Sequence, residues 1–173
     1  MRGYRKRPGT QGFSVPLVGA SLFFIISLFL FVSYKNSAYQ QAKKEIYSLY
    51  TANRAFDLDE VYQDGLTAIY AKEYGKTATE AGCEALEQTG LPYVLLLSQF
   101  SAPVERVYVT NCQLSETGRE KKARTYDYTV SVRFCLEKGD EVLAPEKTMD
   151  FHGTVVMKKK GWFRWLLDGV TLG

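Results

Sequence analysis

The hydrophobic pattern of the chain has three successive regimes: an unbroken apolar run, a helical period, and a period of two. The unbroken run covers residues 13–34 and contains no charged residue. A helix of that length reaches about 33 Å, enough for a hydrocarbon core of about 30 Å. A cleaved signal peptide is the alternative, but its apolar region is normally shorter and the sequence Asn36-Ser37-Ala38 is a poor cleavage site. The run therefore predicts a membrane anchor.

The helical period begins directly after this run and predicts a helix over 37–56. Its apolar seam recurs at spacings of three and four, with one polar member: Tyr39, Ala42, Ile46, Leu49, Asn53 and Phe56. A coiled coil with another copy has this spacing, but the seam lasts fewer than three heptads. An amphipathic helix that packs on its own domain is the favoured interpretation.

Two capping boxes, beginning at Asp57 and Thr77, predict two further helices, because each has a glutamate three residues later. The first helix is expected to end at Gly75. The second is expected over 78–89, with Gly90 as a left-handed stop. A short fourth helix, or a strand, is expected over 91–100.

From Pro103 onward the period changes to two. Even-numbered apolar residues alternate with polar ones in the clearest strand of the chain: Tyr126, Tyr128, Val130, Val132, Phe134 and Leu136. Strands are also expected at about 104–114, 148–158 and 162–172. The connections, which contain Gly118, Gly139 and the run 158–161, are short enough for hairpins, so a four-stranded antiparallel meander is predicted.

These elements predict an α+β fold: an N-terminal transmembrane helix, then about three to four helices packed on a curved four-stranded antiparallel sheet. The expected organisation is a basic cytoplasmic tail (1–12), a transmembrane helix (13–34) and an extracytoplasmic α+β domain (35–173). Four basic residues, Arg2, Arg5, Lys6 and Arg7, precede the apolar run, and the positive-inside rule then places the N-terminus in the cytoplasm.

The net charge of +3 comes from this tail. The rest of the chain has 18 basic and 19 acidic residues, so no basic field covers the whole domain. Direct binding of nucleic acid is therefore not expected.

The last predicted strand contains an aromatic residue followed by a hydrophobic-acidic pattern, Trp165-Leu166-Leu167-Asp168. With helices first and a bent antiparallel sheet last, the chain resembles the cone-shaped nuclear-transport-factor-like (cystatin-like) fold. Its whole layout is similar to the inner-membrane assembly factor of type IV secretion and conjugation systems. The resemblance covers the chain as architecture, and it implies no particular functional residue.

Candidate chemistry is sparse. His152 is the one histidine and lies in a predicted strand, where a structural role is favoured over catalysis. No catalytic, cofactor-binding or metal-binding residues are assigned, and no cofactor is expected. The three cysteines, Cys83, Cys112 and Cys135, have no metal-ligand spacing and are expected to be free thiols, although one disulfide is possible in an oxidising compartment.

Two sets of residues are candidates for binding. The helical seam offers an interaction surface at Tyr39, Ile46, Leu49, Asn53 and Phe56. A cone-shaped pocket between helices and sheet would be lined by Tyr62, Tyr93, Tyr126, Tyr128 and Trp165, although ordinary packing explains most tyrosines. The basic and aromatic run 158–163 can touch lipid headgroups, but a solvated hairpin turn is the favoured interpretation.

The leading functional hypothesis is a non-enzymatic, membrane-anchored scaffold or assembly component of an envelope complex. The most specific form of this hypothesis is a conjugation or type IV secretion channel. Its expected partners are the membrane and other proteins of that complex, and homo-oligomerisation is left open. The alternative is an anchored binding or sensory domain that holds a small apolar ligand in the cone. An anchored hydrolase comes third.

Overall fold

The structure is a computed structural model of the chain and describes residues 15–51, 65–91, 104–136, 146–162 and 164–173. The chain divides into two compact units, Met1–Tyr34 and Lys35–Gly173. Apart from Leu91, the predicted helix over 91–100 lies outside the described residues, as do the capping box at Asp57 and the turn at Gly139.

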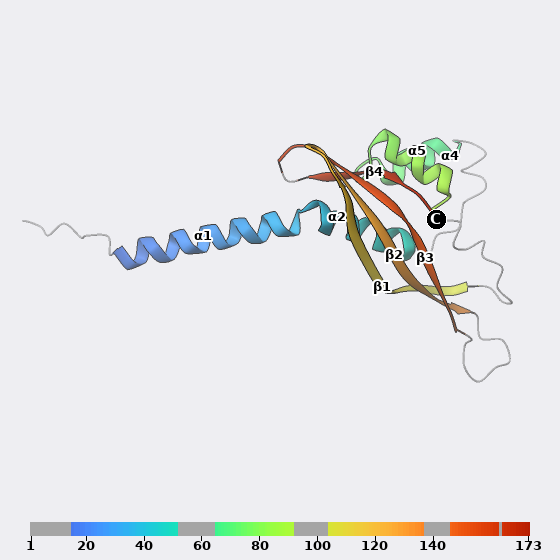
Figure 1. Cartoon of the computed structure of the whole chain (residues 1–173), viewed down its shortest axis with the longest axis horizontal. Helices are drawn as coiled ribbons and strands as arrows, with labels where there is room; N and C mark the ends of the chain where they lie inside the picture. The colour runs from blue at the N-terminus through green and yellow to red at the C-terminus, as the bar shows by residue number, and fades with distance from the viewer. Residues whose placement is uncertain (1–14, 52–64, 92–103, 137–145, 163) are drawn as a thin grey trace, which may run out of the picture. The chain divides into compact units, whose positions relative to one another are not determined.

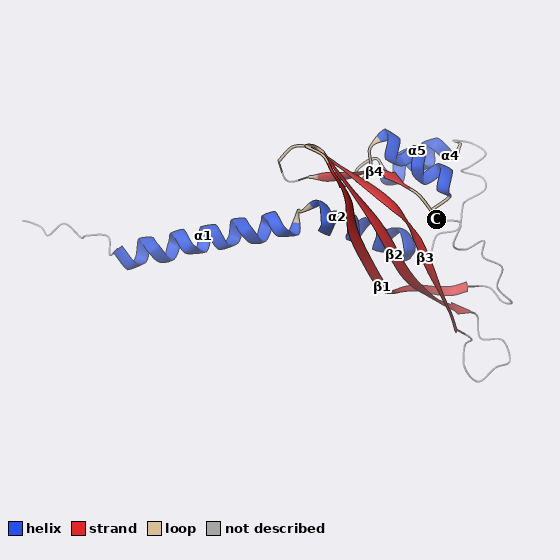
Figure 2. Cartoon of the chain, in the orientation of Figure 1, coloured by secondary structure: helices blue, strands red, loops and turns tan. Residues whose placement is uncertain are grey.

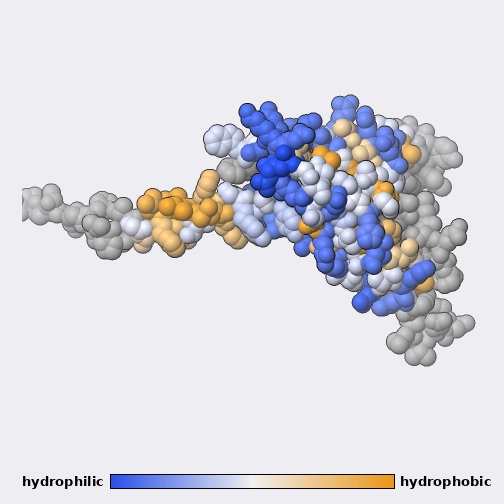
Figure 3. Space-filling model, viewed as in Figure 1, coloured by the Kyte–Doolittle hydropathy of each residue, from blue (hydrophilic) through white to orange (hydrophobic). Residues whose placement is uncertain are grey.

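The described part of the first unit is helix α1 (Val15–Lys35). Its large apolar side chains from Leu22 to Val32 are exposed, at 38% to 74% of their area, and they appear as the hydrophobic band of Figure 3. Over the described side chains, which begin at Gly19, no single helix is both long and apolar enough to count as a membrane span. The part of α1 from Gly19 and helix α2 (Ala38–Thr51) meet that criterion only together, across a bend.

The second unit is an α+β domain (Figures 1 and 2). Its described helices are α2, α4 (Leu66–Tyr74) and α5 (Glu80–Thr89). Its strands are β1 (Val104–Arg119), β2 (Ala123–Leu136), β3 (Glu146–Lys159) and β4 (Trp165–Val170). They form one antiparallel sheet in the order β1-β2-β3-β4, which confirms the predicted four-stranded meander.

The predicted strand limits differ from the observed ones at both ends of the sheet. β1 continues to Arg119, so Gly118, expected in a turn, pairs with Thr125 inside the ladder. β4 is shorter than the predicted 162–172 because the turn at Gly161, with φ 77°, leaves Trp162 outside the ladder. Register shifts interrupt β1 at three places. Such bulges bend and twist a strand, and Figure 1 shows the strands curving around α2.

The predicted alternation of β2 is confirmed. Its six even-numbered residues from Tyr126 to Leu136 are buried, whereas Asp127 and Arg133 are exposed. This inner face meets the buried face of α2, which consists of Ala38, Ala42, Glu45, Ile46, Leu49 and Tyr50. The period of two and the helical period thus supply the two apolar surfaces of one core.

Helix α5 begins two residues later than its capping box predicts. The N-cap is Thr79, whose hydroxyl accepts a hydrogen bond from Gly82 N, and not Thr77. Thr77 O and Thr79 N are both bonded to the backbone of Leu167, at 2.9 and 2.8 Å, in a parallel bridge to β4. The segment therefore stays extended until the bridge ends. The predicted stops at Gly75 and Gly90 are confirmed, and Gly90 is left-handed, with φ 71°.

Candidate functional site

The described part of the predicted seam lies in the core of the domain. Ile46 and Leu49 are buried, and Tyr39 lies at the rim, 38% exposed, with its ring edge-on to Tyr126 at 6.0 Å between centroids. Asn53 and Phe56 lie outside the described residues. Another chain cannot use Ile46 and Leu49 while α2 is packed on the sheet.

Three of the residues predicted to line a pocket are described. Tyr126 and Tyr128 are buried members of the core, and Trp165 is half-buried against it. The guanidinium of Arg124 lies 5.5 Å from the centre of the Trp165 ring, and Lys159 Nζ lies 5.9 Å from it. Tyr62 and Tyr93 lie outside the described residues.

Tyr128 takes part in a buried hydrogen-bond relay that joins α2 to the C-terminal segment. Its hydroxyl donates to Thr171 O at 2.9 Å and lies 3.0 Å from Tyr50 Oη. A carbonyl oxygen can only accept, so the single Tyr128 proton goes to Thr171 and Tyr50 donates to Tyr128. Burial, foremost, raises the pKa of both phenols, so both remain protonated in the physiological range. The relay is structural.

Glu45 is the one buried charged residue recorded in the described chain, with 9% of its area exposed. Burial raises the pKa of its carboxyl above 4.5, while Lys44 and a hydrogen bond from Thr77 act in the opposite direction. A group whose folded pKa is raised binds its proton more tightly in the folded state. The free energy of unfolding therefore falls as pH rises from about 4.5, the pKa of the carboxyl in the unfolded chain, through the raised pKa of the folded state. Over this range Glu45 becomes ionised in the folded domain.

Replacing Glu45 by Gln should raise the melting temperature of the domain at neutral pH and change it little near pH 4, where the carboxyl is protonated in both states. The amide keeps an oxygen for Thr77 but has no charge to desolvate. Thermal melts of the fragment from Asn36 onward across this pH range test the expectation, with Glu84→Gln on the exposed face of α5 as control. A gain at neutral pH that persists unchanged at pH 4 would contradict it.

The outward face of α2 carries a shallow groove of about 450 Å³. Its described lining residues lie on this helix: Gln40, Lys43, Lys44, Tyr47, Ser48 and Thr51. Tyr47 is 48% exposed beside two lysines. Exposed tyrosines are enriched at protein interfaces, so this face is a candidate contact surface.

A second candidate surface lies where the two hairpin turns β1–β2 and β3–β4 meet. We call residues 119–124, 158–162 and 164–165 the hairpin tip. The turns are joined by a hydrogen bond from Lys159 N to Lys122 O at 2.7 Å. A hollow of about 320 Å³ between them is lined by Lys121, Lys122, Lys159, Gly161 and Trp162. Figure 3 shows strongly hydrophilic residues gathered at this end of the sheet.

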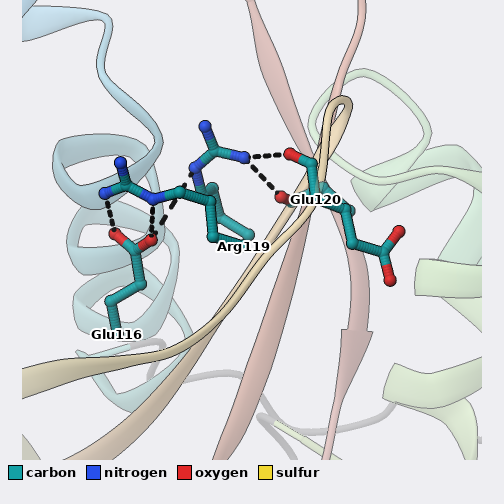
Figure 4. A network of polar contacts seen from close by, with 5 residues as sticks. Glu116, Arg119 and Glu120 are labelled. Atoms are coloured by element: carbon teal, nitrogen blue, oxygen red, sulfur yellow. Dashed lines mark hydrogen bonds and ion pairs between the residues drawn. The ribbon is translucent and has the colours of Figure 1, made fainter.

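An ion-pair network at the end of the β1–β2 hairpin supports the tip (Figure 4). Arg119 binds the Glu116 carboxylate through Nε at 2.5 Å and Nη2 at 3.1 Å, and this hydrogen bonding lowers the pKa of Glu116. Arg124 Nε lies 3.9 Å from the same carboxylate, and its Nη1 donates to the backbone oxygens of Glu120 and Ala123. Both arginines are thus engaged within the hairpin, while Lys121 and Lys122 project from its turn.

The sequence shows both parts of this surface but not that they are in contact. The basic run 158–160 is evident by eye, and so is the charged segment 119–124, but nothing in their spacing indicates that they lie together. The pairing of β2 with β3, which sets Ala123 opposite Lys158, brings them side by side.

The remaining sequence candidates lie apart from one another. His152 is exposed on β3, with Nδ1 3.1 Å from Thr129 Oγ1. Cys83, Cys112 and Cys135 are free thiols, and burial raises the pKa of each. No cluster of three histidine, cysteine, aspartate or glutamate side chains suited to a metal ion occurs within the described ranges.

The chain was compared with protein families, with curated proteins and with solved structures. No family model and no curated protein matches the chain. Among solved structures, an "Ntf2 like protein involved in plasmid conjugation" is similar to it, with 12% sequence identity and a TM-score of 0.42. The similarity covers 79% of this chain and 50% of that one, so the chain spans about half the length of its neighbour.

Proposed function

We propose that the chain is a membrane-anchored assembly component of an envelope complex and that it performs no catalysis. The observation that carries this proposal is the apolar surface of α1, where every large side chain from Leu22 to Val32 is exposed. Such a surface is stable only in hydrocarbon or against another protein. It is joined directly to a domain with its own core, between Ala38 and Val170.

The proposed topology places the N-terminus in the cytoplasm and the domain outside it. The support is the basic tail, since Arg2, Arg5, Lys6 and Arg7 all precede the apolar run. In the most specific form of the proposal, the envelope complex is the channel of a conjugation or type IV secretion system. The support for this form is the element order: a basic tail, an apolar helix, further helices and four antiparallel strands.

The proposed assembly surface is the outward face of α2 around Tyr47. Anchoring confines copies of the domain to two dimensions, which raises their effective concentration without any new contact. A weak interface then suffices in the membrane, whereas the separate domain stays monomeric at micromolar concentration. Ile46 and Leu49 need not leave the core for this contact to form.

The test is photocrosslinking of the full-length chain in its native membrane, with a photoreactive residue in place of Tyr47. We expect a crosslink between two copies that survives an alkaline carbonate wash of the membranes. The matched control carries the photoreactive residue in place of Asp127, which is exposed on the face of β2 that points away from α2. A chain released by carbonate is not anchored. A chain that is retained but monomeric, with its neighbours present, argues against the assembly role and favours the ligand-binding alternative.

A further inference from the structure

The domain has a strongly uneven charge distribution. The two segments that build and support the hairpin tip, 116–124 and 158–168, contain eight basic and three acidic residues. The remaining described residues of the domain, from residue 35 onward, contain eight basic and nine acidic residues. The hairpin tip is therefore basic while the rest of the described domain is nearly neutral, and such an arrangement orients the domain in the field of a negative surface.

This basic end is also the end at which the chain enters the domain from α1. Tyr39, in the first turn of α2, packs on Tyr126, and Tyr126 is three residues from the start of β2 at Ala123. Three residues of strand span about 10 Å. Figure 1 shows the first turn of α2 and the two hairpin turns at the same end of the sheet. If α1 is in a bilayer, the tip lies within reach of its headgroups.

The positive charges of the tip differ in what they already bind. Lys158 pairs with Asp168 at 3.4 Å, and Arg119 and Arg124 are held by Glu116 and by backbone oxygens. Among the described residues, no ion pair is recorded for Lys121, Lys122, Lys159 or Lys160, and all four are exposed. These four ammonium groups are available to an external anion.

Trp162 gives the tip an apolar member. It is 87% exposed, the largest exposed fraction recorded for a large hydrophobic residue in the described chain, and it follows the left-handed Gly161 in the β3–β4 turn. Trp165, three residues later, is instead half-buried beneath Arg124 and Lys159. An exposed tryptophan flanked by lysines matches the interfacial zone of a bilayer, where indole rings and ammonium groups are enriched.

We propose that the hairpin tip docks on the headgroups of anionic phospholipids. In this arrangement Lys121, Lys122, Lys159 and Lys160 bind lipid phosphates and Trp162 enters the interface. The contact rests on the proposed function, because α1 must hold the domain at the bilayer. It fixes the orientation of the domain there and leaves the outward face of α2 free for a second copy.

The test uses the full-length chain in nanodiscs made from brominated phosphatidylcholine with about 30 mol % phosphatidylglycerol, an anionic content that gives a marked surface potential. Bromine quenches nearby indoles, and the chain has two tryptophans. The difference between the wild type and Trp162→Phe isolates the signal of Trp162. We expect strong quenching and a blue shift of Trp162, both of which weaken when phosphatidylglycerol is omitted.

A charge variant and a matched control complete the design. Each lysine near an anionic surface contributes about fivefold to association, so Lys121→Gln, Lys122→Gln and Lys160→Gln together should reduce the docking equilibrium roughly a hundredfold. The control carries Trp162→Phe and Tyr108→Trp. It places an exposed indole on β1 opposite Arg133, well away from the tip, and should not be quenched.

The outcomes separate the two proposals. A chain that does not enter nanodiscs overturns the anchored function. A chain that enters them but shows equal quenching at Trp162 and at the Tyr108 position, or quenching independent of phosphatidylglycerol, overturns the docking of the tip alone. Loss of quenching on addition of single-stranded DNA at an equal phosphate concentration would also overturn it, in favour of a nucleic-acid ligand.

Discussion

Replacing Val132 by Asp is expected to unfold the α+β domain. Val132 is fully buried in the middle of β2, between Val109 of β1 and Met149 of β3. A carboxylate there would lose its hydration among apolar side chains, at a cost of about 3–5 kcal/mol or more. The total stability of a domain of this size is only about 5–15 kcal/mol. The fragment from Asn36 onward should show a lost or strongly lowered thermal transition by circular dichroism.

The control is the neighbouring residue, Ser131→Asp, whose side chain is on the other face of the sheet. Ser131 is partly exposed and lies opposite Asp150 of β3, so the new carboxylate meets a like charge in water. We expect a cost within about 1 kcal/mol. A larger loss for Ser131→Asp than for Val132→Asp would mean that the register of β2 is shifted by one residue.

Replacing Gly153 by Ala is expected to give the second large effect. A Cβ at this position of β3 would overlap Thr171 O and would lie 2.7 Å from Tyr128 Oη. Thr171 O is a backbone atom and accepts the hydrogen bond of Tyr128, so neither neighbour can move without breaking the relay to Tyr50. Overpacking costs about 1–3 kcal/mol and the lost hydrogen bond about 1 more.

Gly169→Ala is the matched control for this substitution. Gly169 lies in β4 opposite Val156, and a Cβ there would meet the nearest Val156 carbon at 3.7 Å, an ordinary contact. We expect the Gly153 variant to melt roughly 6–12 °C below the wild type and the Gly169 variant within about 2 °C of it. Combining Gly153→Ala with Tyr128→Phe should not restore stability, because the overlap with Thr171 O remains. Equal melting of the two alanine variants would show that the C-terminal segment does not pack against Gly153.

The parts of the fold that follow from local pattern were predictable. The alternation in β2 shows which residues face inward, because successive side chains of a strand point to opposite faces. The spacing in α2 likewise places Ile46 and Leu49 on one apolar face of the helix. It does not show whether that face packs on the same domain or on another copy of the chain. That ambiguity is physical, because an amphipathic surface is equally well covered by either partner.

The candidate surfaces were less predictable than the fold. The Thr77 capping box satisfies the local rule, yet a bridge to Leu167 holds the chain extended and moves the cap to Thr79. Tyr128, a predicted pocket residue, donates instead to Thr171, 43 residues away. Such contacts depend on pairs far apart in the chain, and no local period encodes them.

The sequence by itself determined the order of elements, the inward face of β2, the antiparallel meander and the apolar run before the domain. Each of these depends on the spacing of apolar residues over a few helical turns or strand positions. Over such a distance the spacing distinguishes between a helix, a strand and an unbroken apolar run. Only the tertiary structure decided that Lys121 and Lys122 lie beside Lys159 and Trp162, and that this basic end is the one where α2 begins. The physical reason is that strand pairing sets the position of each turn, and the charge of a surface depends on every turn that reaches it.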